Sequence, residues 1–145
     1  MRGELRWRSN WRVVGPPGAT QIQVRASRYA RRASEQDLRE LPVGTSVVLV
    51  ATGPRAGKRC KAVAGRGGMA VEGTYLAFPS AEAPAYLVED ARASVRVFLQ
   101  NILVAPPHAR PSLSTLAAVR VLRSLGMRRT LRALAPGRVV VGRRV

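Results

Sequence analysis

The sequence predicts an α/β fold: a small mixed sheet with helices packed on it, an N-terminal β-hairpin, a basic C-terminal helix and a closing strand. Short apolar, strand-like runs alternate with segments of helical periodicity, which favours a layered α/β sandwich over a helical bundle. Hydrophobic residues make up 46% of the 145 residues, enough for an ordinary buried core. We therefore expect one domain over residues 1–145, with a hairpin-containing arm at residues 1–33.

The first elements are a hairpin and a short helix. Two strand-prone segments within residues 11–26 flank the turn Gly15-Pro16-Pro17-Gly18, as expected of a β-hairpin. Ser34-Glu35-Gln36-Asp37 has the spacing of a capping box, so a helix is expected to begin at Ser34. The turn Leu41-Pro42-Val43-Gly44 should end that helix.

A buried strand and a second helix should follow. Residues 47–50 read VVLV, a continuous apolar run that indicates a strand covered on both faces. A helix is expected from Lys58 to about Arg66, where Gly67-Gly68 would stop it. The β-prone stretch Met69–Phe78 predicts a further strand, and Ala85–Val88 a short one beside it.

The C-terminal part is expected to be helical up to a last strand. Asp90 is positioned to cap a helix over residues 94–103, and Ser112 to cap a long helix over residues 113–134. Ala135-Pro136-Gly137 should end the long helix. The sequence RVVVGRRV, residues 138–145, then predicts the closing strand.

The stretch VVLVATGPRAGKRC, residues 47–60, has the general look of a phosphate-binding loop. That loop requires four residues between its glycines and a Ser or Thr after the lysine, which holds Mg²⁺. Gly53 and Gly57 enclose only three residues, and Arg59 stands in the place of the hydroxyl. The sequence thus argues against a P-loop nucleotide triphosphatase, and we expect a simple strand-to-helix connection.

The charge of the chain predicts an anionic partner. Lysine and arginine number 25 against 8 acids, a net charge of +17, and eleven arginines but no acid follow Asp90. Such a field attracts RNA, DNA, anionic lipid or phosphorylated substrates, although an arginine-rich composition alone would also contribute. Arg6-Trp7-Arg8 also interleaves aromatic and cationic side chains, as single-stranded nucleic-acid platforms do. The candidate polyanion-binding residues are Arg55, Lys58, Arg59, Lys61, Arg120, Arg123, Arg128, Arg129 and Arg132.

Few residues offer catalytic or metal-binding chemistry. Cys60 and His108 are the only cysteine and the only histidine, too few for a disulfide or a histidine-based metal site. His108 is either a general base or a loop residue facing solvent, and Cys60 is best explained as a small buried residue. The acidic pair Glu89-Asp90 is better explained as a helix cap than as a catalytic dyad.

The N-terminal sequence lacks the apolar core of a secretory signal, and no run reaches the roughly 18 apolar residues needed to cross a bilayer. A cytoplasmic location is therefore expected. Attachment to a membrane surface stays open, because a basic amphipathic helix over residues 113–134 would suit an anionic interface.

From Leu38 onward the order of turns and strands resembles the C-terminal half of class I S-adenosylmethionine-dependent methyltransferases. The stretches that carry it are SVVLVA (46–51), GGMAVEGTYLAF (67–78), TYLAFPSAEAPAYLVED (74–90) and LRALAPGRVVVGRR (131–144). They are also similar to the tails of methyltransferase- and phosphotransferase-like proteins of bacterial glycan and secondary-metabolite pathways. Residues 34–145 would form this methyltransferase-like half.

The resemblance implies substrate-side positions but no cofactor site. Tyr75, Pro79 and Ser80 match a recurring element of these tails, and a complete transferase with an unfamiliar site would add His108. The acid-x-Gly-x-Gly-x-Gly loop that binds S-adenosylmethionine in this family is missing from the sequence. The resemblance therefore implies an accessory or catalytically reduced transferase subunit, whose partner chain would supply the cofactor half. The alternative is a basic module that binds nucleic acid or an anionic membrane surface.

Overall fold

The computed structural model of the chain describes residues 17–78, 81, 84, 86–99, 117, 131–132 and 135–145. These residues form two compact units. The first contains the described residues up to Leu87 together with Ala135–Val145, and the second contains those between Val88 and Leu134.

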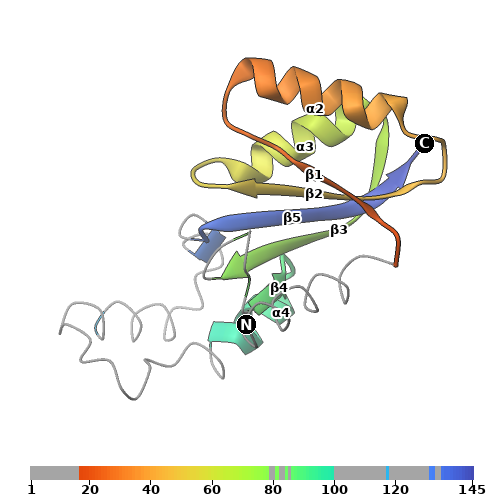
Figure 1. Cartoon of the computed structure of the whole chain (residues 1–145). Coiled ribbons are helices and arrows are strands. Elements are labelled where there is room, and N and C mark those ends of the chain that lie inside the picture. The colour runs from red at the N-terminus through yellow and green to blue at the C-terminus, as the bar shows by residue number, and fades with distance from the viewer. Residues whose placement is uncertain are drawn as a thin grey trace, which may run out of the picture. The chain divides into compact units, whose positions relative to one another are not determined.

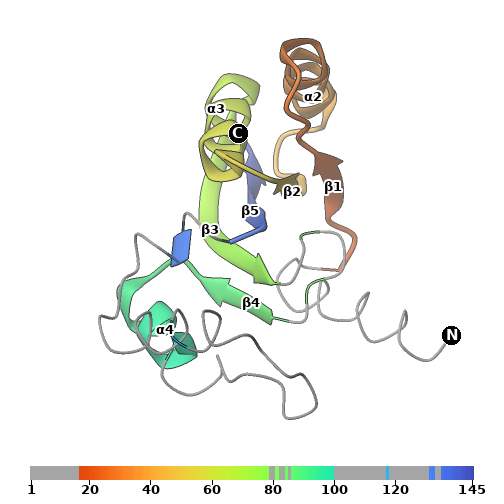
Figure 2. The ribbon, with the colours of Figure 1, turned by 90° about the vertical axis from the view of Figure 1, so that its left-hand side faces the viewer.

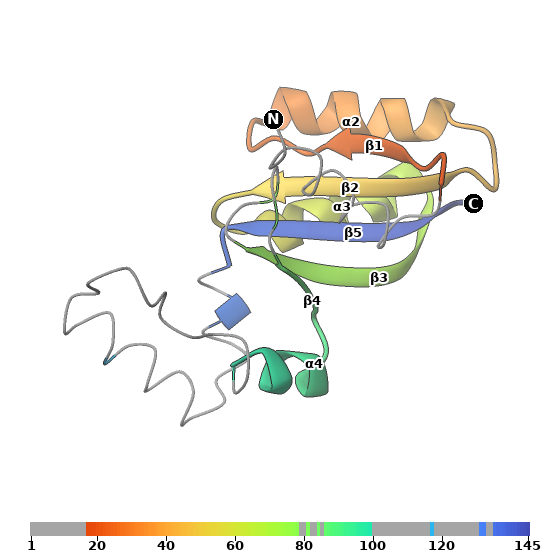
Figure 3. The ribbon, with the colours of Figure 1, turned by 60° about the horizontal axis from the view of Figure 1, so that its bottom comes forward.

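A five-stranded sheet in the order β1-β2-β5-β3-β4 organises the fold (Figure 1). Its strands are β1 (Thr20–Gln23), β2 (Ser46–Thr52), β3 (Met69–Phe78), β4 (Tyr86–Glu89) and β5 (Gly137–Arg144). Strand β1 runs parallel to β2, whereas β5 is antiparallel to both β2 and β3. Because β2 and β3 both oppose β5, they point in the same direction, as Figure 3 shows. The predicted α/β fold with a mixed sheet is confirmed.

Strand β2 is buried on both faces, as its continuous apolar sequence predicts. Val47, Leu49 and Ala51 belong to one apolar cluster, and Val48 and Val50 belong to another. Side chains alternate between the two faces of a strand, so the two clusters lie on opposite sides of the sheet.

The helices α2 (Arg28–Glu40) and α3 (Ala56–Gly67) cover one face of this sheet side by side (Figure 2). Leu38 of α2 and Cys60 and Val63 of α3 are fully buried in the same cluster as Leu49. A Cβ atom on Gly67 would overlap the side chain of Leu38, so this glycine lets the two helices approach closely. Helix α3 ends at Gly67, and its C-cap Gly68 has a φ of 71°, which agrees with the predicted Gly-Gly stop.

The start predicted for the helix after β1 is wrong. Helix α2 begins at Arg28, six residues before Ser34, and Ser27 is its N-cap, accepting a hydrogen bond from the Ala30 N–H at 3.1 Å. Ser34 is buried inside the helix, where its hydroxyl donates to the carbonyl of Ala30 at 3.0 Å. Its capping-box spacing has no capping function here because a serine within a helix bonds back to the preceding turn. The predicted end is confirmed, since α2 ends at Glu40.

The closing strand lies inside the sheet rather than at its edge. Register pairs Val141 of β5 with Val48 of β2 and with Gly73 of β3. A Cβ atom on Gly142 would overlap the backbone carbonyl of Ala70, so this position requires glycine for β5 and β3 to pair closely. Strands β2, β3, β4 and β5 all lie within two residues of their predicted bounds.

In the second unit, helix α4 (Arg92–Val97) begins after Ala91 rather than at the predicted cap Asp90. Asp90 instead forms an ion pair with Arg132, with 2.8 Å between Oδ2 and Nη2. Glu89 accepts a hydrogen bond from the Ser94 hydroxyl at 3.1 Å. The acidic pair is thus occupied by contacts within this unit. The first strand of the predicted hairpin, and the predicted long helix apart from residues 117, 131 and 132, lie outside the described residues.

Candidate functional site

The carboxyl ends of three strands lie along one edge of the sheet. Strands β1, β2 and β3 point the same way and end at Gln23, Thr52 and Phe78. In open α/β sheets, ligands bind outside the carboxyl ends of parallel strands. This edge is therefore the first place to look for a site.

The loop from β2 to α3 lies at this edge. Hydrogen bonds from neighbouring parts of the same chain hold it in place. The Gly53 N–H donates to the carbonyl of Pro136 at 2.9 Å, and the Ala56 N–H donates to the carbonyl of Gly53 at 3.3 Å. The guanidinium of Arg59 donates to the carbonyl oxygens of Thr52 and Pro54. Arg59 thus closes the loop from within, and the predicted strand-to-helix connection is confirmed.

The candidate polyanion-binding residues on α3 and its loop differ in their exposure to solvent. Arg55, Lys58 and Lys61 are exposed to solvent, whereas Arg59 is half-buried against the loop. Arg132 forms the ion pair with Asp90. The other candidates of that group, Arg120, Arg123, Arg128 and Arg129, lie outside the described residues.

Of the substrate-side candidates, the structure describes only Tyr75. Its half-buried ring packs against a core cluster that contains Ala77 and Val139. Tyr75 pairs with Val139 in the interior of the sheet, three residues before the end of β3. Pro79, Ser80 and His108 lie outside the described residues.

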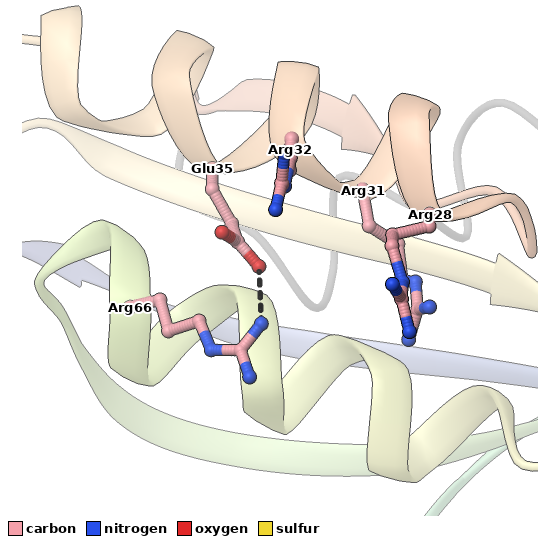
Figure 4. A pocket seen from close by; sticks show the side chains of 5 residues that line it. All are labelled: Arg28, Arg31, Arg32, Glu35 and Arg66. Carbon is pink, nitrogen blue, oxygen red and sulfur yellow. Dashed lines mark hydrogen bonds and ion pairs between the residues drawn. The ribbon is translucent and has the colours of Figure 1, made fainter.

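A cationic groove lies between α2 and α3 in the described part of the chain. Its cavity of about 340 Å³ is lined by Arg28, Arg31, Arg32, Glu35 and Arg66 (Figure 4). We call this feature the arginine groove. Four of its five lining residues are arginines, whose guanidinium groups have the chemistry that binds anions.

Helical spacing brings the four lining residues of α2 together. Arg28, Arg31, Arg32 and Glu35 stand at positions i, i+3, i+4 and i+7, which share one face of a helix. The neighbouring face of α2 carries Leu38 into the core, so the arginine face is turned toward the rim of α3. Figure 4 shows that the side chains of Arg28 and Arg31 extend from α2 in the direction of α3.

One end of the arginine groove is closed by polar contacts. Glu35 Oε1 and Arg66 Nη1 form an ion pair at 3.3 Å. Arg39 donates from Nε at 3.0 Å and Nη2 at 2.8 Å to the carbonyl of Arg66, which belongs to the last turn of α3. A cation at that position also interacts favourably with the negative end of the helix dipole. These contacts fix α2 against α3 at the Glu35 end of the groove.

The other end carries unneutralised positive charge. Within the described residues, the side chains of Arg28, Arg31 and Arg32 have no acidic partner, and the buried Nε of Arg31 has no hydrogen-bond partner. No acid lies in the first turn of α2, where the helix dipole is also positive. Guanidinium groups held together without counter-charge repel one another, and a bound anion relieves that repulsion.

Comparison with protein-family models, with curated proteins and with solved structures finds no match for this chain. Its function is therefore inferred from its own geometry. Among the described residues, no three histidine, cysteine or acidic side chains gather to hold a metal ion. In the same part of the chain, no helix is long and apolar enough to cross a membrane.

The arginine groove was not found from the sequence. A helix start at Ser34 leaves Arg28, Arg31 and Arg32 in a loop, where they have no common face. Their spacing of three and four residues is the signal that indicates a shared face, once the helix is extended back to Ser27.

Proposed function

We propose that this chain forms the C-terminal, substrate-side half of a methyltransferase-like transferase and acts with a partner chain that supplies the cofactor half. The strand order carries the proposal. Two parallel strands, β1 and β2, are followed by β3 in the same direction, and the last strand β5 is inserted antiparallel between β2 and β3. A mixed sheet with an antiparallel last strand is what the resemblance to the C-terminal half of class I methyltransferases implies.

The described residues do not fit S-adenosylmethionine by themselves. The Gly-containing turn that follows β2, Gly53 to Gly57, holds Arg55 in a left-handed conformation and is covered by Arg59. No acid lies in this loop to bind the ribose hydroxyls of a nucleoside. The proposal therefore assigns this chain substrate binding and leaves cofactor binding to the partner.

A fusion protein tests this proposal. The glycine-rich N-terminal half of a class I methyltransferase is joined to Ala19, so that its central strand can pair with the edge strand β1. Isothermal calorimetry should detect S-adenosylmethionine binding to the fusion but not to the isolated chain. In the matched control Gln21→Pro, which removes a backbone donor from the free edge of β1 without changing a core side chain, binding should be lost.

Two results contradict the proposal. One is S-adenosylmethionine binding by the isolated chain, which would place a cofactor site within it. The other is a fusion that is folded by circular dichroism but does not bind the cofactor.

The arginine groove favours a second candidate function, a basic module that binds a polyanion. Three arginines that have no acidic partner among the described residues line one cavity, in a chain with a net charge of +17. Phosphate contacts made by arginine release condensed counterions, so affinity for heparin or nucleic acid should fall steeply as salt rises.

A further inference from the structure

The N-terminal turn of α2 combines the arginine groove with an exposed aromatic ring. Tyr29 is 86% exposed and directly follows Arg28. It also stands three residues before Arg32, so the two side chains are neighbours on the helix surface. An aromatic face is thus presented to solvent beside the cationic end of the groove.

Among the described residues, Tyr29 is not part of an apolar surface. The other exposed large hydrophobic residues in the described part of the chain are Val43, Val71, Tyr86, Val97 and Val145, none of which lies on α2 or α3. A helix that binds a membrane surface needs a broad apolar stripe opposite its cationic face. A single tyrosine between arginines does not provide one.

We propose that the arginine groove and Tyr29 together bind single-stranded nucleic acid. The phosphates of consecutive nucleotides lie along Arg28, Arg31 and Arg32, and a base next to them stacks on Tyr29. This inference rests on the second candidate function, polyanion binding, and names its ligand.

The dimensions and chemistry of the site suit a flexible strand. A cavity of about 340 Å³ is at the small end of ligand pockets, so it holds a phosphodiester segment rather than enclosing whole bases. Single strands offer unstacked base faces, which bind aromatic side chains with little sequence preference, whereas the bases of a duplex are stacked on each other. A solvent-exposed tyrosine therefore discriminates between single-stranded and duplex nucleic acid.

Fluorescence anisotropy with two labelled 12-mers of equal charge tests the proposal. One is a mixed-sequence DNA strand, and the other is an abasic strand with the same phosphates. The full chain should bind the strand with bases about tenfold more tightly, the equivalent of one stacked base. Tyr29→Ala should remove this preference without weakening binding to the abasic strand, and Tyr29→Phe should keep it.

Replacing the arginines of the groove should change binding differently from replacing Tyr29. Arg28→Ala with Arg31→Ala should weaken binding of both strands alike and reduce the slope of log affinity against log salt by about 1 to 1.5. The charge-matched control is Arg92→Ala with Arg96→Ala, two exposed arginines of α4. It should leave the preference for bases unchanged and weaken binding less. Circular dichroism checks that each variant is folded.

The possible results test the identity of the ligand and the underlying polyanion-binding function separately. Equal affinity of the full chain for both strands, or an equal loss for both in Tyr29→Ala, overturns the stacking role of Tyr29. Tighter binding to a duplex 12-mer, or binding only to phosphatidylserine-containing vesicles, overturns single-stranded nucleic acid as the ligand. No salt-dependent binding to either strand, to the vesicles or to heparin overturns polyanion binding itself.

Discussion

Cys60 has a thiol that the fold keeps protonated. The residue is fully buried in the first turns of α3, and burial raises the pKa of its thiol to about 12, against the opposing effect of the Arg59 and Arg138 charges. The ordinary value is 9.0. A thiol at this pKa is not a nucleophile at neutral pH, which agrees with the expectation of a small buried residue.

The raised pKa predicts a loss of stability in alkali. Above about pH 9 the unfolded thiol ionises while the folded one stays protonated, so the unfolded state binds fewer protons. The stabilising contribution is complete below pH 9 and is lost as the pH rises toward 12. Relative to Cys60→Ala, the free energy of unfolding should fall by up to about 1.4 kcal/mol per pH unit in that range.

Urea unfolding of both proteins at pH 8, 10 and 11 measures this difference. The lysines, tyrosines and arginines that also titrate there are common to both chains, so they cancel in the comparison. A constant difference at the three pH values would mean that the thiol is not buried as described.

At the scale of elements, glycines set how closely neighbouring elements pack. Gly142 of β5 faces the carbonyl of Ala70 in β3, and a side chain there must push the two strands apart. Gly65 in α3 has open space around the position of a Cβ atom. The same substitution should therefore have opposite effects at the two sites.

We expect Gly142→Ala to destabilise the protein by about 3 kcal/mol, as overpacking in a core does. Gly65→Ala should stabilise it by about 0.5 to 1 kcal/mol, because alanine favours a helix over glycine. Chemical denaturation midpoints measure both. Equal effects of the two substitutions would contradict the close pairing of β5 with β3.

The strands could be predicted from the sequence because their signals are local. The run VVLV in β2 and the β-prone stretch of β3 are bounded by turns, and the apolar run of β5 follows the turn at Pro136-Gly137. The start of α2 could not be placed, because Ser27 lacks an acid three residues later whereas Ser34 has one. Ser34 therefore carried the stronger capping signal.

The position of β5 in the sheet required the whole molecule. Nothing in RVVVGRRV indicates that it pairs with both β2 and β3, since strand pairing depends on contacts between residues far apart in the sequence. The arginine groove could not be predicted from the sequence for a related reason. Four of its lining residues share a face of α2 through helical spacing, whereas Arg66 belongs to α3 and joins them only when both helices are folded against the sheet.

The last prediction concerns the effect of the net charge on stability. A net charge of +17 on 145 residues destabilises the compact state by self-repulsion, which dissolved ions screen. Raising NaCl from 20 to 500 mM should therefore increase the free energy of unfolding. A gain of about 1 kcal/mol would raise the Tm by about 4 °C for a chain of this size.

A charge-changed variant separates screening from other effects of salt. Arg92→Glu with Arg96→Glu changes two exposed side chains of α4, each by two units of charge. It should be more stable than the wild type at 20 mM NaCl and gain less from added salt, because there is less repulsion to screen. If differential scanning calorimetry shows the same salt dependence for both proteins, repulsion is not what limits stability. The positive charge would then be tolerated without cost, and a polyanion would gain nothing by neutralising it beyond the contacts it makes in the arginine groove.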